Sequence, residues 1–116
     1  MEYLLQIKAV CSRIRAKMVL IDIPVCVQVD TKYLNFYKSI GFDVGAEMTK
    51  ANKPQQRLAD FAKKHDLPFL DLLPIFASHP EMELYYSHDD HWTIAGHQLA
   101  AESIKDFLIQ QSLIYP

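Results

Sequence analysis

Two short apolar segments, each closed by a proline, most constrain what this chain can fold into. The first, MVLIDIP, covers residues 18–24, and the second, PFLDLLP, covers residues 68–74. Nearly continuous runs of this kind are typical of strands buried on both faces of a parallel sheet. Helical patterns cover residues 3–17, 52–67 and 93–111, so helices and strands alternate along the chain. This alternation predicts an α/β layer fold with a parallel sheet.

The length of 116 residues suits one compact domain, so residues 1–116 are predicted to form a single domain. Two strands alone make a poor sheet, because short apolar strands need neighbours on both edges. Residues 31–42 predict only a short helix, and no third strand is evident. The chain is therefore expected to hold part of a larger sheet.

Composition narrows the classes of function. The formal net charge is −2 and no basic stripe alternates with aromatic residues, so nucleic acid is not an expected partner. No apolar run approaches the roughly 20 residues that span a bilayer. The N-terminus lacks a signal-peptide pattern. The sequence therefore does not predict a cellular compartment. Cys11 and Cys26 belong to no C-x-x-C pair and are predicted to be small buried hydrophobic residues.

The most informative stretch is YYSHDDHWTIAGHQLAAESIKDFL, residues 85–108. Within it, Asp89 and His91 are two positions apart in a predicted loop, where such residues can project to the same side. Asp89 would then bind Nδ1 of His91 and leave Nε2 free to accept a proton. The loop follows the second strand, and sites in open α/β sheets gather outside the carboxyl ends of strands. The pair is therefore a candidate acid–base site.

Two other interpretations of this stretch stay open. In one, Asp89 and Asp90 bind the free N–H groups at the start of the last helix, and His91 is an ordinary surface residue. In the other, His88, Asp89, His91 and His97 hold a metal ion, although their spacing departs from the i, i+4 pattern of zinc-binding helices.

The same stretch resembles the C-terminal signature of the SGNH/GDSL hydrolase superfamily, D-x-H-W-(N/T)-x-x-G-H-x-x-x-A. The segments MVLIDIPVCVQVD and KPQQRLADFAKKHDLPFLDLLPIF are also similar to that superfamily, so the resemblance covers most of the chain from about Met18. It implies a three-layer α/β/α, flavodoxin-like parallel sheet and a Ser-His-Asp triad, with His91 as general base and Asp89 as orienting acid. Such enzymes need no metal or organic cofactor, so the resemblance implies none. It further implies that Gly96 allows close packing at the helix start and that His97 supports the cap region.

Two features depart from the family pattern. The commonest spacing there is D-x-x-H, but His88 lies three residues before His91, so only Asp89 fits, at D-x-H, and Asp90 stays an alternative acid. The Gly-Asp-Ser turn that carries the family nucleophile is also missing, as are the Gly and Asn blocks of the oxyanion hole.

These departures shape the predicted function. The chain is expected to be the C-terminal portion of an SGNH-hydrolase-like domain, carrying the His-Asp part of an acyl-ester hydrolase or O-acyltransferase for small-molecule or carbohydrate esters. Its expected partners are the missing N-terminal half or a second copy in a homo-oligomer. The alternative is a non-catalytic α/β binding or assembly module that retains a relic catalytic loop.

Overall fold

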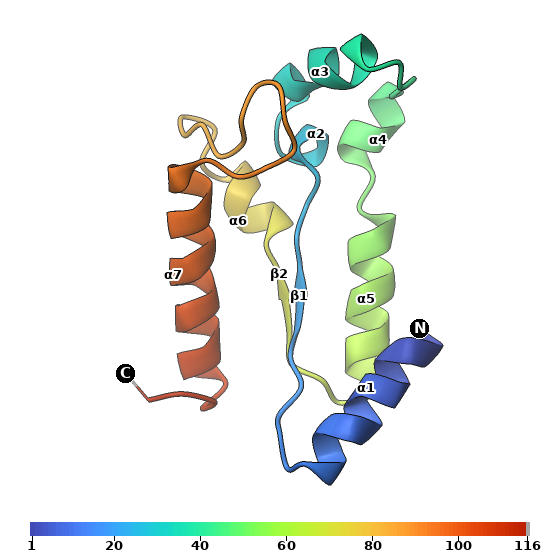
Figure 1. The fold of residues 1–116 in the computed structure, drawn as a ribbon, viewed down its shortest axis with the longest axis vertical. Helices are drawn as coiled ribbons and strands as arrows, with labels where there is room; N and C mark the ends of the chain where they lie inside the picture. The colour runs from blue at the N-terminus through green and yellow to red at the C-terminus, as the bar shows by residue number, and fades with distance from the viewer. Residues whose placement is uncertain (116) are drawn as a thin grey trace.

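The computed structural model describes residues 1–115, and Figure 1 shows two strands running through the middle of the molecule. In chain order the elements are α1 (Glu2–Arg13), β1 (Leu20–Asp22), α2 (Cys26–Val29), the 3-10 helix η1 (Thr31–Tyr33), α3 (Leu34–Ser39), α4 (Ala46–Lys50), α5 (Lys53–Lys64), β2 (Phe69–Asp71), α6 (Leu73–Ala77) and α7 (Ile94–Gln110). Helix α7 lies on one side of the strands and α5 on the other, while the short helices α2, α3 and α4 gather at one end.

The two strands pair in parallel, with Leu20 opposite Phe69 and Asp22 opposite Asp71. The N–H of Leu20 donates to the carbonyl of Pro68 at 2.9 Å, in line with this register. In a parallel ladder, consecutive residues of a strand bond to opposite sides. The N–H and C=O of Ile21 therefore face away from β2. Within residues 1–115 no third strand covers this free edge of β1.

The expectation of a three-layer α/β/α parallel sheet is wrong for this chain. Helices account for 55% of the residues and strands for 7%. Each strand has only three residues, and residues 25–53 form short helices instead of a further strand. A layered sheet needs several strands whose faces helices can cover, and a two-stranded ribbon offers too little surface. Burial on both faces of the first strand is not found either, because Ile21 is 37% exposed.

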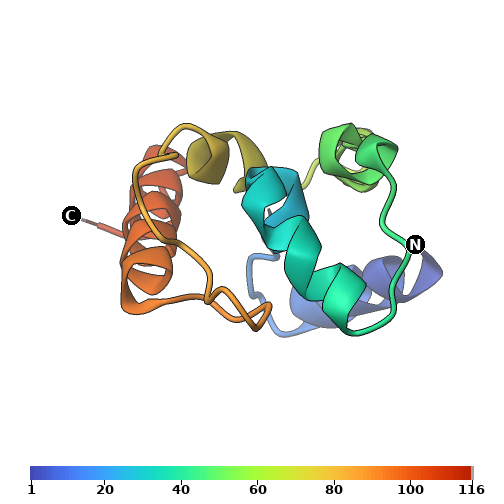
Figure 2. The same cartoon turned by 90° about the horizontal axis from the view of Figure 1, so that it is seen from above.

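The molecule is open rather than closely packed. Its accessible surface is 8149 Å², whereas a compact monomer of this mass exposes about 6,500 Å². Its radius of gyration is 16.0 Å, compared with about 13 Å for a compact domain of this length. Helix α1 contains no buried residue, and Figure 2 shows it at one border of the molecule, on the opposite side from α7. None of the helices within residues 1–115 is long and apolar enough to cross a membrane.

The core lies at the end of the molecule where the strands stop. Leu72, Phe76 and Leu84 are almost fully buried there, together with Cys26 at the start of α2. Tyr85 joins this cluster and donates its hydroxyl hydrogen to the carbonyl of Pro24 at 2.5 Å. The core therefore fixes Tyr85, the residue that directly precedes the predicted site.

All three predicted long helices are present, although α1 ends at Arg13, four residues before its predicted limit, and the limits of α5 and α7 have local physical reasons. Helix α5 has a proline in its first turn and two lysines in its last, which suits the direction of the helix dipole. Helix α7 begins after Thr93, whose side-chain oxygen accepts a hydrogen bond from the N–H of Gly96 at 3.2 Å. This cap sets where the preceding loop ends.

Candidate active site

Residues 86–91 form a tight turn that we call the His91 loop. Tyr85 and Trp92 pair as an antiparallel bridge at its base, and the N–H of Tyr86 donates to the carbonyl of His91 at 3.1 Å. The N–H of Thr93 donates to the carbonyl of Leu84 at 3.0 Å. The loop is therefore closed at its base and leads directly into α7.

Asp89 and His91 contact each other within this loop. The carboxylate oxygen Oδ1 of Asp89 accepts a hydrogen bond from the backbone N–H of His91 at 2.9 Å and also contacts Nδ1 of the imidazole. These two hydrogen bonds lower the pKa of the Asp89 carboxyl below its usual range. An ionised carboxylate only accepts hydrogen bonds, so Nδ1 carries the proton and Nε2 is the basic nitrogen.

The imidazole of His91 is open to solvent and borders a small depression. Its side chain is 83% exposed, and no hydrogen bond to Nε2 is present among residues 1–115. The depression has a volume of about 190 Å³ and is lined by Ile23, Asp90, His91, Trp92 and His97. The indole of Trp92 packs on the ring of Phe76 with centroids 5.4 Å apart, so one wall of the depression belongs to the core.

Asp90 turns away from its neighbour and binds two other side chains. Its Oδ1 accepts a hydrogen bond from the thiol of Cys26 at 3.0 Å, and its Oδ2 accepts one from the hydroxyl of Tyr37 at 2.5 Å. Asp89 is therefore the carboxylate that contacts His91, and Asp90 serves a different set of partners. We call Cys26, Tyr37 and Asp90 the Asp90 cluster.

Cys26 and Tyr37 were not predicted from the sequence as partners of this region. Burial is the largest cause, and the hydrogen bond to Asp90 the second, of a rise in the pKa of the Cys26 thiol to about 12. The same two causes raise the pKa of Tyr37. The position of Cys26 two residues after Pro24, which closes the first apolar run, is the sequence signal for its place near the loop.

Two further predicted residues stand near the helix start. A Cβ atom on Gly96 would lie 2.2 Å from the carbonyl oxygen of Leu84, so the close approach expected of this glycine is present. The ring of His97 packs edge-on against Trp92 with centroids 5.3 Å apart. Both residues shape the base of the His91 loop rather than its exposed tip.

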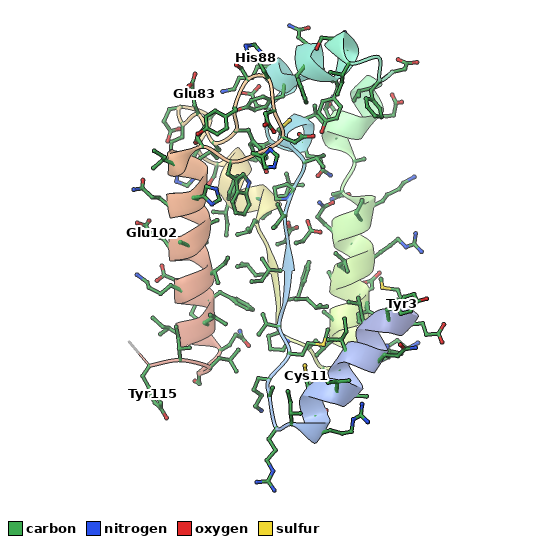
Figure 3. All side chains as sticks on the ribbon, viewed as in Figure 1. Tyr3, Cys11, Glu83, His88, Glu102 and Tyr115 are labelled. Carbon is green, nitrogen blue, oxygen red and sulfur yellow. The ribbon has the colours of Figure 1, made fainter. Side chains whose placement is uncertain are left out.

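The side chains considered for a metal site do not converge. His88 lies at the upper end of the molecule in Figure 3, on the exposed part of the loop. Asp89 is engaged by His91, while His97 packs on Trp92. Within the described part of the chain, no three His, Cys, Asp or Glu side chains are grouped so that they would hold a metal ion.

No nucleophile meets His91 among the described residues. Cys26 is fully buried, and a thiol with a pKa of about 12 is protonated at neutral pH, so it does not replace the missing serine. Four serine hydroxyls donate to carbonyls of their own helices or turns, and the one that also contacts an imidazole, Ser78, lies 3.2 Å from Nδ1 of His79 and not beside His91. They belong to Ser12, Ser39, Ser78 and Ser103, with O···O distances of 3.0, 2.6, 2.7 and 2.7 Å.

A second, larger cavity lies at the other end of the molecule. It has a volume of about 700 Å³, and Lys8, Arg15 and Lys17 outnumber the single carboxylate, Asp66, in its lining. The ammonium group of Lys8 donates to the backbone carbonyl of His65 there. The lining residues come from α1, from the segments before β1 and β2 and from the segment after α7, which lie at the end of the molecule opposite to the His91 loop (Figure 1), so the cavity has no part in the acid–base pair.

Comparison of the sequence and the structure with family models, curated proteins and solved structures found no match.

Proposed function

We propose that this chain carries the general-base half of a Ser-His-Asp acyl-ester hydrolase or O-acyltransferase of the SGNH type. The observation that carries the proposal is the contact between Asp89 and Nδ1 of His91, which leaves Nε2 uncommitted beside a small depression. The resemblance of residues 85–108 to the SGNH/GDSL signature supports the same assignment. Function rests on these residues rather than on the fold.

In the proposed reaction, Nε2 of His91 removes the proton of a nucleophilic hydroxyl, whose oxygen attacks the carbonyl carbon of the ester. The tetrahedral intermediate collapses, the C–O bond breaks, and the leaving alkoxide takes the proton from Nε2. Water or an acceptor alcohol then repeats these steps on the acyl group, giving an acid or a new ester. Asp89 holds the imidazole in the required tautomer and stabilises its protonated form.

The nucleophile has to come from another polypeptide segment or another molecule, because no serine or reactive thiol meets His91 among the described residues of one chain. In this proposal the chain works as the C-terminal portion of a longer catalytic unit, or pairs with a separate half or with a second copy. Its substrate is a small-molecule or carbohydrate ester, and the chemistry needs no metal or organic cofactor. Alone, the pair is expected to supply only general-base catalysis, roughly 10²–10⁴-fold.

The test is hydrolysis of p-nitrophenyl acetate by the wild-type chain and by three variants. We expect His91→Ala to bring the rate down to that of buffer, because the base is lost, and Asp89→Asn to lower it in part, because the tautomer is no longer fixed. His88→Ala is the matched control, since it removes an imidazole from the same loop. Equal rates for the wild type and His91→Ala would remove His91 from the mechanism.

The second candidate is a non-catalytic binding or assembly module that retains a relic loop. It is favoured by one observation, the lack of a serine or reactive thiol beside His91 among the described residues. It predicts equal, background rates for all four proteins. It also predicts that a fluorophosphonate probe labels neither this chain nor a longer protein that contains it.

A further inference from the structure

The His91 loop has one polar attachment to the rest of the molecule. Its backbone hydrogen bonds join Tyr86 to His91 and to Asp89, and thus stay within the loop. The Asp89 carboxylate also stays within the loop, because it binds His91. Among residues 1–115, Asp90 is the loop residue whose side chain binds partners elsewhere in the chain.

These partners are fixed in the fold. Cys26 is fully buried at the first position of α2, and Tyr37 belongs to α3 and packs edge-on against the rings of Phe36 and Phe42. They lie 64 and 53 residues from Asp90 in the sequence. Each carboxylate oxygen of Asp90 thus meets a donor from a different helix, and hydrogen bonds to a charged acceptor are the stronger ones.

We infer that Asp90 is a positioning residue, whose carboxylate holds the His91 loop against α2 and α3 and so determines where His91 lies. Asp89 sets the orientation of the imidazole within the loop, and Asp90 sets the place of the whole loop. The consequence for catalysis rests on the proposed function, whereas the attachment of the loop does not.

The first experiment measures alkylation of Cys26 by iodoacetamide at pH 8, read by mass spectrometry, in the wild type, Tyr37→Phe and Tyr3→Phe. Tyr37→Phe keeps the packed ring and removes the hydroxyl. Tyr3→Phe makes the same change at a residue of α1 that is 78% exposed. Cys11, which is partly exposed, gives an internal reference rate in every protein.

We expect Cys26 to react roughly tenfold faster in Tyr37→Phe, as loss of a hydrogen bond to a charged group favours opening of the loop. The Tyr37 hydroxyl also lowers the pKa of the Cys26 thiol. Removing this hydroxyl would by itself reduce the thiolate fraction of Cys26 and slow the reaction. A faster reaction therefore reports opening of the loop and not activation of the thiol. Unchanged protection of Cys26 in Tyr37→Phe would overturn the inference.

The second experiment separates hydrogen bonding from packing at Cys26. Cys26→Ser keeps a donor for Asp90, whereas Cys26→Ala is of similar size and has none. We expect the heteronuclear ¹H–¹⁵N NOE of the amides of the His91 loop to stay high in Cys26→Ser and to fall in Cys26→Ala. Equal values in the two variants, or a loss shared by amides throughout the chain, would show that Cys26 acts only through packing and would contradict the inference.

Neither readout requires turnover. If the esterase assay fails while the loop responds as expected, the proposed function falls and the positioning role of Asp90 stands. If the assay succeeds while the loop does not respond, the reverse holds.

Discussion

Asp89 and Asp90 are chemically identical neighbours with different roles, because consecutive side chains in the loop point to different sides. The contact between Asp89 and His91 follows from a spacing of two residues, so the sequence predicted it correctly as a geometric relation. The partners of Asp90 are distant in the sequence, and no local pattern indicates them. Local chemistry was thus predictable at this site, and the tertiary attachment was not.

The Asp89 carboxyl gives a direct test of the contact by pH titration. Because hydrogen bonds from His91 lower its pKa, we expect titration of Asp89 below the usual value of about 3.9. Its stabilising contribution is present above the unfolded-state pKa and is lost as the pH falls through the lower, folded-state pKa. Titration followed by carboxyl ¹³C NMR measures this value.

In His91→Ala, the same resonance should titrate closer to the ordinary pKa. The hydrogen bond from the imidazole is lost, and the one from the backbone N–H of residue 91 is weakened. His88→Ala should leave it where it is in the wild type. An Asp89 pKa that does not move in His91→Ala would mean that the two side chains are apart in solution.

Among the elements, the ends of β1 and β2 bring two carboxylates together, since Asp22 lies opposite Asp71 in the sheet. Burial raises the pKa of the Asp71 carboxyl and the neighbouring Asp22 adds to the rise, while a hydrogen bond from the N–H of Leu73 opposes it. Asp22 has its own partner, the side-chain amide of Gln55 at 2.8 Å. Asp71 is the last residue of β2, and its carboxylate accepts a hydrogen bond from the first residue of α6 but also carries an unfavourable charge.

Asp71→Asn should therefore be at least as stable as the wild type at pH 7, because it keeps the acceptor and removes the charge. Asp71→Ala should be less stable by about 1 kcal/mol, as a hydrogen bond is lost. A raised pKa favours the folded state below the unfolded-state pKa, and this benefit disappears as the pH rises through the folded-state pKa. The advantage of Asp71→Asn should thus vanish at low pH.

Urea unfolding of the three proteins at pH 7 and pH 4 measures these differences. If Asp71→Asn is as unstable as Asp71→Ala at pH 7, the charge of Asp71 stabilises the fold and the argument fails.

The elements themselves were largely predictable, because their signals are local. Thr93 caps α7, as the preference of threonine for N-cap positions favours, and both apolar runs form strands. The short helices in residues 25–53 were not foreseen beyond one of them, since four- to six-residue helices depend on packing rather than on periodicity. The two apolar segments also do not indicate how many further strands pair with them, so the layered architecture was wrongly predicted.

At the scale of the whole molecule, the free edge of β1 is the least protected feature. Ile21 and Ile23 expose 37% and 59% of their surface beside unpaired backbone groups. Open edges of this kind invite pairing with another chain. We therefore expect the sedimentation coefficient of the isolated chain to rise with concentration.

Amide exchange can locate the contact. The N–H of Leu20 should be protected at every concentration, because it bonds to Pro68, whereas that of Ile21 should gain protection only on association. Ile21→Lys should prevent association through its charge, and Ile94→Lys, at a position of α7 that is 75% exposed, is the control. A folded monomer at all concentrations, with rapid exchange at Ile21, would contradict this expectation.

The cationic cavity also has a consequence for how the molecule attracts ions. That cavity and the acidic His91 loop lie near opposite ends of a body 46 Å long, as the positions of Cys11 and His88 illustrate (Figure 3). We therefore expect the cavity to attract anions and the loop to attract cations, despite the small net charge of the chain. This attraction should fade with salt, because the Debye length is about 8 Å at physiological ionic strength.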